Sequence, residues 1–218
     1  MPFRPLETPP LIAGAGPVGL AAALFLARRG KSVRLVEAAR QPASQSRALA
    51  VNPRTLELLE TTGVARAMLE LGKPITGVRF YQSRKPVASL SFAGIHPKFP
   101  FMLLLSQAAS NALLAKALEA AGGRIERGIK LTDLTRDGNG LVVTLERSGE
   151  RTRVRAPWLL AADGAHSAAR RALEVPSRGS GFRAAWHLAD VPLRTPLFTL
   201  AVRATLAPWL LTPVPDGT

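Results

Sequence analysis

The chain has 218 residues, of which 47% are hydrophobic, and its 29 basic and 15 acidic side chains give a formal net charge of +14. This length and apolar content are typical of a globular protein with a substantial core and exclude a disordered chain. The absence of cysteine excludes disulfides, thiolate nucleophiles and cysteine-based zinc sites. The basic residues are scattered and no aromatic-rich platform accompanies them, so we expect no nucleic-acid partner.

The stretch from residue 11 to residue 37 has the pattern of a βαβ unit that binds a dinucleotide. An apolar run leads into GAGPVG, an Ala- and Leu-rich helix follows, and a second apolar run ends at Glu37. In this pattern Gly14 permits the tight turn, Gly16 lets a pyrophosphate approach the backbone, and Gly19 lets the helix pack closely on the sheet. A glycine-rich turn in an ordinary α/β unit is the alternative. The position of the motif between strand and helix, with its acid at the right distance, favours the dinucleotide.

The two ends of the dinucleotide motif predict which ligand it takes. The helix N-terminus offers unpaired N–H groups and the positive end of the helix dipole to a phosphate. Glu37 would accept both ribose hydroxyls and repel a 2′-phosphate, which favours FAD or NAD over NADP. The predicted cofactor-binding residues of this unit are Gly14, Ala15, Gly16, Pro17, Val18, Gly19 and Glu37.

The uncharged stretch 11–27 is neither a secretory signal nor a membrane span. It has no basic segment before it, a glutamate stands at position 7, and Gly and Pro interrupt the apolar run. Nothing in the sequence requires export, so we expect a cytoplasmic protein.

The remaining elements follow in chain order. Residues 1–10 and 38–51 read as loose or loop segments, and Asn52-Pro53 predicts the N-cap and first residue of a helix that ends at Gly63. Alternation predicts paired strands over 75–83 and 86–94, and a helix begins at Ser106. Strands are predicted over 124–137, 140–147 and 151–163, and the run from Trp158 to Ala162 is expected to be buried. A short basic helix over 165–175, strand-like segments from residue 182 and a Pro-Asp-Gly turn complete the chain.

Three stretches together resemble the class A FAD-dependent aromatic monooxygenases, which have the p-hydroxybenzoate hydroxylase fold. They are GAGPVG with Glu37, Gln107 at a helix start, and ADGAHS at 162–167 with Arg170. The segment SRALAVNPRTLELL, with Arg47, also resembles that family. The resemblance implies an α/β fold with a Rossmann-like FAD-binding domain (1–73 and 106–178) interrupted by part of a β-rich substrate domain (74–105 and 179–218).

The resemblance also implies roles for further residues. Arg47 and Gln107 would contact the ribityl-phosphate region of FAD, and Asp163 with Gly164 would lie near the pyrophosphate, in a stretch linked in the family to NAD(P)H use. The position of Asp163-Gly164 at a strand end agrees, because α/β sheets place their ligands there. A strand-ending turn or a helix cap is the alternative for Asp163.

The implied function is an NAD(P)H-dependent monooxygenase that hydroxylates an aromatic or polycyclic small molecule. The cofactor carries the chemistry, so no catalytic residue is named, and the three histidines suggest no metal site. The family's third motif, a Gly-Asp before a Pro- and Gly-rich helix start, does not occur in the chain. We therefore expect the N-terminal part of a longer enzyme or a shortened relative. A flavin-dependent reductase or dehydrogenase without oxygen insertion and a non-catalytic nucleotide-binding fragment remain alternatives.

Overall fold

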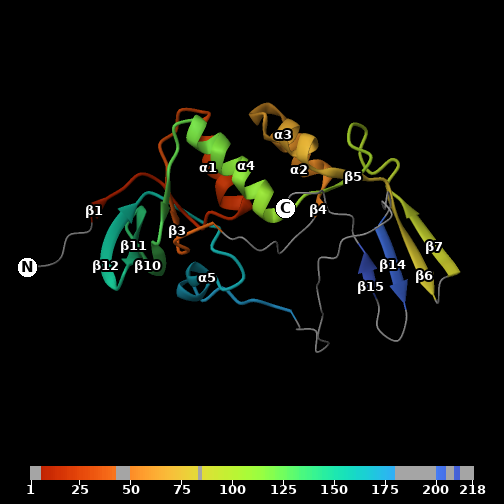
Figure 1. Ribbon diagram of the computed structural model, residues 1–218. Helices are drawn as coiled ribbons and strands as arrows, with labels where there is room; N and C mark the ends of the chain where they lie inside the picture. Colours follow the sequence, from red (N-terminus) through yellow and green to blue (C-terminus); the bar gives the residue numbers. More distant parts are fainter. Residues whose placement is uncertain (1–5, 43–49, 83–84, 180–199, 205–208, 212–218) are drawn as a thin grey trace, which may run out of the picture. The chain divides into compact units, whose positions relative to one another are not determined.

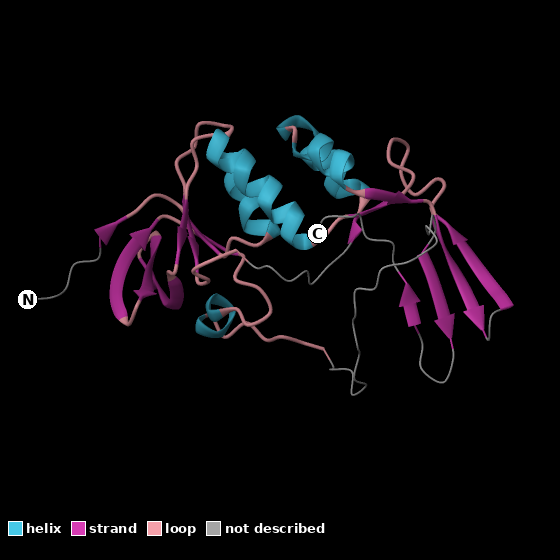
Figure 2. Ribbon diagram, in the orientation of Figure 1, coloured by secondary structure: helices cyan, strands magenta, loops and turns pink. Residues whose placement is uncertain are grey.

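The computed structural model describes residues 6–42, 50–82, 85–179, 200–204 and 209–211 (Figures 1 and 2). The chain divides into two compact units, one made of residues 1–46 and 107–176 and the other of residues 47–106 and 177–218. Residues 47–106 of the second unit thus lie in the sequence between the two segments of the first unit. Segment 47–73, however, groups with the inserted unit and not with the unit that carries the glycine motif.

The core of the first unit is a four-stranded parallel sheet. Its order is β13 (Leu159–Ala161), β2 (Leu11–Ala13), β3 (Arg34–Glu37) and β9 (Ile125–Arg127). The helix α1 (Pro17–Ala27) connects β2 to β3, and α4 (Gln107–Ala120) leads into β9. These two helices lie side by side (Figure 1). The predicted βαβ unit is therefore present, and its first strand is central and short, as the two prolines before it require.

A second sheet of the same unit covers the other face of the parallel sheet. Its order is β1 (Leu6–Glu7), β12 (Glu150–Ala156), β11 (Gly140–Arg147) and β10 (Lys130–Asp137). Strands β10, β11 and β12 are antiparallel neighbours, whereas β1 pairs with β12 in parallel. The expectation of a loose segment before residue 11 was wrong at Leu6–Glu7, because this dipeptide pairs with Val154 and Arg155 far along the chain.

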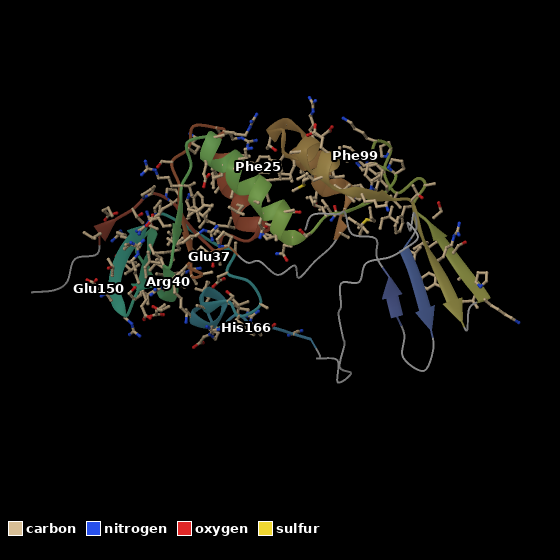
Figure 3. All side chains as sticks on the ribbon, viewed as in Figure 1. Phe25, Glu37, Arg40, Phe99, Glu150 and His166 are labelled. Atoms are coloured by element: carbon tan, nitrogen blue, oxygen red, sulfur yellow. The ribbon has the colours of Figure 1, made fainter. Side chains whose placement is uncertain are left out.

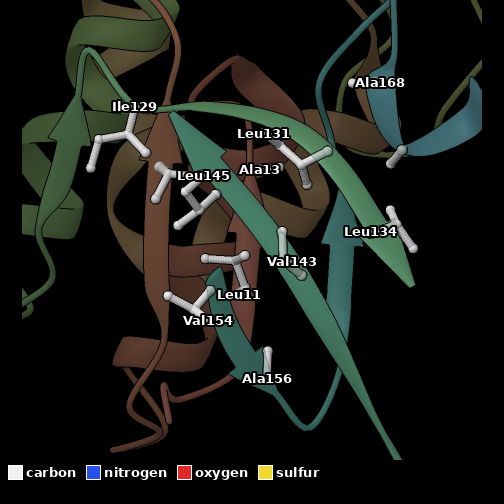
Figure 4. Close-up of a cluster of buried hydrophobic side chains, with 12 residues drawn as sticks. Leu11, Ala13, Ile129, Leu131, Leu134, Val143, Leu145, Val154, Ala156 and Ala168 are labelled. Atoms are coloured by element: carbon white, nitrogen blue, oxygen red, sulfur yellow. The ribbon is translucent and has the colours of Figure 1, made fainter. Parts of the chain in front are cut away.

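The apolar core of the first unit lies between its two sheets and under α5 (Ala168–Ala172) (Figure 4). Alternation along β11 directs Val143 and Leu145 into this core. The buried cluster consists of Leu11, Ala13, Val36, Ile129, Leu131, Leu134, Val143, Leu145, Val154, Ala156, Ala168 and Ala169.

The expectation of a buried strand over Trp158–Ala162 was wrong. Leu159 and Leu160 of β13 are only partly buried, Ala161 is exposed, and Trp158 is 42% exposed. The reason is position, since β13 is an edge strand of the sheet within the described residues and has a neighbour, β2, on one side only.

The second unit contains two further sheets. The first is β4 (Ala50–Val51), β8 (Met102–Leu104) and β5 (Lys73–Ile75), and the other is β15 (Trp209–Leu211), β14 (Leu200–Ala204), β6 (Gly77–Gln82) and β7 (Lys85–Ser91). Because β4 and β5 both pair with β8, the helices between them fold with this unit. Residues 50–51, expected in a loop, form β4 for the same reason. The pairing of β6 with β7 confirms the predicted hairpin.

The first helix of the second unit begins at Pro53, as predicted, but it ends at Leu59, and a 3-10 helix continues the segment to Thr62, just before Gly63. The helices of this unit are α2 (Pro53–Leu59), a short 3-10 helix η1 (Glu60–Thr62) and α3 (Val64–Leu71). Asn52 caps α2 by accepting a hydrogen bond from the backbone N–H of Thr55, and Gly63 takes a left-handed conformation with φ of +79°.

Two predicted features lie where the structure describes no residues. The strand-like segment from residue 182 and the Pro-Asp-Gly turn lie outside the described residues. In the part of the chain that the structure describes, no helix has the length and apolar character needed to cross a membrane.

Candidate cofactor site

The carboxyl edge of the parallel sheet gathers most of the predicted site residues. Gly14 follows β2, Glu37 ends β3, and Asp163 comes two residues after β13. Helix α1 begins at this edge, and so does α4, because α4 precedes the parallel strand β9 and its first residue, Gln107, starts from the same side. Ligands of open α/β sheets bind at this edge. The predicted residues therefore converge where a ligand is expected.

Two glycines of the motif are required by the fold itself. Gly14 has a φ of +102°, and a Cβ atom there would lie 2.3 Å from the carbonyl oxygen of Ala162. A Cβ atom at Gly19 would lie 1.8 Å from the carbonyl oxygen of Gly14. Both distances are far below contact distance, so a side chain at either position would push the turn, the helix and β13 apart.

Gly16 is different, because a Cβ atom there would meet no atom within 4 Å. The backbone at Gly16 is extended, with φ of −74°, so the residue needs no left-handed conformation either. Its lack of a side chain leaves open space beside the start of α1, which is where a pyrophosphate would approach.

The N-terminus of α1 has the features of an anion site. Gly16 caps the helix without any side-chain hydrogen bond, Pro17 occupies the first turn, and no acidic residue lies there. Val18, the next residue, is 66% exposed. By contrast, the side chain of Asn52 caps α2. The first turn of α1 therefore keeps its positive dipole end open to a phosphate.

The carboxylate of Glu37 is held in place by two backbone groups. Its Oε2 accepts a hydrogen bond from the N–H of Ala15 at 2.6 Å, and its Oε1 accepts one from the N–H of Ala39 at 2.8 Å. Glu37 is labelled in Figure 3. Each carboxylate oxygen has a second lone pair, so both can still accept a ribose hydroxyl. The negative charge fixed here would repel a 2′-phosphate.

Asp163 divides its two oxygens between two tasks. Its Oδ2 accepts hydrogen bonds from the backbone N–H groups of Ala168 at 2.7 Å and Ala169 at 3.2 Å, which caps α5. Its Oδ1 is buried and has no hydrogen-bond partner among the described residues. A buried carboxylate oxygen without a donor is costly, so this atom fits a hydroxyl or water at a bound ligand. The helix-cap alternative thus explains only one oxygen.

The rest of the ADGAHS motif shapes its own loop. Gly164 has a φ of +77°, and Ser167 caps α5 by accepting from the N–H of Arg170 at 3.0 Å. The guanidinium of Arg170 donates to the carbonyl of Ala165 at 2.8 Å. His166, labelled in Figure 3, has its carbonyl bound by Arg171. These contacts give the motif a structural role in presenting Asp163.

The structure says less about two other predicted site residues, Gln107 and Arg47. Gln107 is the first residue of α4, as predicted. Arg47 lies outside the described residues.

Two residues of the same edge were not predicted. Asn111 stands one turn after Gln107 on α4, and its Oδ1 is buried without a partner in the described part of the chain. Arg127 ends β9 next to Glu37. The spacing of four residues from Gln107 is a signal that could have identified Asn111.

A cavity of about 340 Å³ lies elsewhere in the first unit. Its lining includes Arg34 and Glu126, which form two hydrogen bonds of 2.7 and 2.9 Å, and it includes none of the predicted site residues. The cavity is therefore separate from the candidate site.

Comparison with known proteins identifies relatives of this arrangement. The family model described as "FAD binding domain" matches residues 7–218. The 6-methylpretetramide 4-monooxygenase of Streptomyces rimosus is 37% identical over 185 residues, which cover 84% of this chain and 33% of that protein. The pentachlorophenol 4-monooxygenase of Sphingobium chlorophenolicum is 29% identical over 184 residues, or 83% of this chain and 34% of that protein.

Solved structures give the same result. The flavin-dependent monooxygenase PieE, crystallised with FAD and substrate, superposes with a TM-score of 0.73 at 28% identity, covering 81% of this chain and 34% of PieE. The anhydrotetracycline hydroxylase OxyS from Streptomyces rimosus superposes with a TM-score of 0.71 at 28% identity, covering 81% of this chain and 35% of OxyS. The chain thus spans about a third of the length of the relatives it matches.

Proposed function

The chain belongs to the family of the FAD binding domain, and from that premise we propose that it forms the FAD-holding part of a flavoprotein monooxygenase. The observation that carries the proposal is the buried Oδ1 of Asp163. This atom has no donor among the described residues, and it lies at the sheet edge where the glycine motif and Glu37 converge. The resemblance to class A aromatic hydroxylases, first seen in the sequence, is confirmed by the family match and the monooxygenase relatives.

In the proposed complex the predicted site residues would hold successive parts of FAD. The open first turn of α1 would bind the pyrophosphate, with Gly16 leaving room for it, and Glu37 would accept the ribose hydroxyls. Asp163 would accept a hydroxyl or a water at its Oδ1, while Gln107 and Arg47 would contact the ribityl-phosphate region. When bound, FAD supplies the redox chemistry, and the protein supplies binding, orientation and electrostatics.

The substrate, the electron donor and the location are further parts of the proposal. Relatives are named for 6-methylpretetramide, pentachlorophenol and anhydrotetracycline. We propose by analogy that the protein hydroxylates an aromatic or polycyclic small molecule, takes electrons from NAD(P)H and works in the cytoplasm.

The first test is an absorbance spectrum of the purified 218-residue chain after incubation with FAD and removal of free cofactor. Retained bands near about 375 and about 450 nm, typical of a protein-bound flavin, are the expected result. A colourless protein would show that these residues alone do not hold FAD.

The second test concerns the reaction. A protein that contains this chain and the remaining length of its relatives should oxidise NAD(P)H in the presence of an aromatic substrate and incorporate oxygen from O₂ into the product. Product formation without that oxygen would favour the reductase or dehydrogenase alternative.

A further inference from the structure

The end of β9 lies beside the residue proposed to hold the ribose. Arg127 ends β9 and pairs in register with Glu37, the last residue of β3. Neighbouring strands of a sheet lie about 4.8 Å apart, and residues paired in register direct their side chains to the same face. Arg127 therefore shares the face of Glu37 at the carboxyl edge of the sheet.

The segments that follow these two strands run side by side. The N–H of Ile129 donates to the carbonyl of Glu37 at 2.9 Å, and the N–H of Gly128 donates to the carbonyl of Ala39 at 3.3 Å. Gly128 has a φ of +73°, and a Cβ atom there would lie 3.4 Å from Cγ of Arg40. The close approach keeps residues 127–129 next to residues 37–40.

The guanidinium of Arg127 has no partner in the described part of the chain, although the residue is partly buried. The neighbouring charged groups are already engaged. Both oxygens of Glu37 accept backbone hydrogen bonds, Arg40 donates to the hydroxyl of Ser148 at 3.3 Å, and Glu126 binds Arg34. A planar cation is thus left available at the edge of the site.

Strand order indicates which part of a dinucleotide reaches this cation. The sheet runs β13-β2-β3-β9, with the phosphate-binding turn after β2 and the ribose-binding Glu37 at the end of β3. A dinucleotide that follows this order places its pyrophosphate at β2, its ribose at β3 and its adenine at β9. Arginine stacks well on aromatic faces because its guanidinium is planar and weakly hydrated.

We propose that Arg127 packs its guanidinium against the adenine ring of bound FAD and so contributes to selection of an adenine dinucleotide. The proposal rests on the proposed function, because it assumes that FAD occupies this edge. The proposal gives Arg127, which belongs to none of the sequence motifs, a role in cofactor binding.

The test uses the whole 218-residue chain and measures FAD affinity by flavin fluorescence, with ADP and inorganic pyrophosphate as competitors. R127A should weaken FAD and ADP binding by about tenfold, since both contain adenine. R127K should bind within about twofold of R127A, because an ammonium group keeps the charge but loses the planar surface. Pyrophosphate, which has no adenine, should compete equally well against every variant.

R124A is the matched control. Arg124 is exposed and directly precedes β9, at the opposite edge of the sheet from Arg127. Its replacement by alanine removes the same charge as R127A. Its affinities should equal those of the unmodified chain, and thermal unfolding should show that all variants fold. Equal weakening by R124A and R127A would show a general charge effect and overturn the proposal, as would full affinity of R127A or of R127K. If the unmodified chain binds neither FAD nor ADP, the proposed cofactor site itself is wrong.

Discussion

His96 and Glu57 are in contact within the second unit, through the Nε2 atom of the imidazole and one carboxylate oxygen. Nδ1 of His96 accepts the backbone N–H groups of Lys98 and Phe99 at 3.2 and 3.1 Å. Its Nε2 lies 3.4 Å from Oε2 of Glu57. The ring also stacks on Phe99. His96 thus holds the 94–100 loop against α2.

Replacement of His96 by alanine should destabilise the protein by about 1 to 2 kcal/mol, because two backbone N–H groups lose their acceptor and Phe99 loses a stacking partner. Urea unfolding of H96A beside the unmodified chain measures the change. FAD affinity should not alter, since His96 belongs to the unit that does not carry the glycine motif. An unchanged unfolding midpoint would contradict the assigned role.

The pH dependence of stability should include a contribution from Glu57. The hydrogen bond from Arg54, followed by that from His96, lowers the pKa of Glu57 below its ordinary value of 4.5. Because the folded state has the lower pKa, the stabilisation is fully present above the ordinary value and is lost as pH falls through the lowered one. Urea unfolding from about pH 7 to about pH 3 should show the stability difference between the unmodified chain and E57Q shrinking at the acidic end. A difference that stays constant with pH would refute this assignment.

Substitution of the three motif glycines by alanine should affect stability at two positions and FAD affinity at the third. G14A and G19A should each cost about 3 kcal/mol of stability, because the added Cβ would overlap a backbone carbonyl oxygen. G16A should unfold at the same denaturant concentration as the unmodified chain, since nothing lies within 4 Å of the added atom. Its FAD affinity should fall at least about tenfold, because the methyl group would occupy the approach of the pyrophosphate. Normal FAD binding by G16A would place the pyrophosphate elsewhere.

Glu37 should determine both affinity and discrimination at the ribose. E37Q should weaken FAD binding by about tenfold, since one carboxylate oxygen becomes an amide that cannot accept from Ala15 or Ala39. Adenosine 2′,5′-bisphosphate should compete poorly for the unmodified chain and better for E37Q, because the repelling charge is gone. E126Q is the control, as Glu126 pairs with Arg34 away from the proposed ribose position. Equal competition by adenosine 2′,5′-bisphosphate in E37Q and in the unmodified chain would contradict the proposed role of Glu37.

A comparison of D163A with S167A should separate the roles of the two carboxylate oxygens of Asp163. Both residues cap α5, so D163A and S167A should each cost about 1 kcal/mol of stability. Only D163A removes the buried Oδ1 that lacks a partner, so only D163A should also weaken FAD binding. Equal FAD affinities of the two variants would show that Asp163 acts as a cap alone.

Local features of the fold could be predicted from the sequence, because they depend on residues close together in the chain. The cap at Asn52, the left-handed Gly63 and the hairpin of β6 and β7 belong to this class. The glycine motif does as well, since its residue types are set by one turn.

Features that depend on distant pairing were not predicted. Leu6–Glu7 forms β1 only because β12 lies beside it, and segment 47–73 joins the inserted unit only because its flanking strands meet β8. The exposure of β13 depends on its place in the sheet order, which its apolar sequence does not reveal. Arg127 was not predicted as a site residue, because only the folded chain shows that its guanidinium has no partner among the described residues. Asn111 was missed although its spacing from Gln107 was a signal for it.

The close contact between Gly14 and the carbonyl of Ala162 also has a consequence for biosynthesis. The glycine turn is translated almost 150 residues before the backbone that packs against it. The segment that contains the glycine turn therefore cannot complete its packing while residues 47–106 are translated. Until then its apolar strands stay exposed to chaperones and to other nascent chains. Synthesis paused before residue 162 should yield a nascent chain that protease digests at the glycine turn, whereas release after that point should protect it.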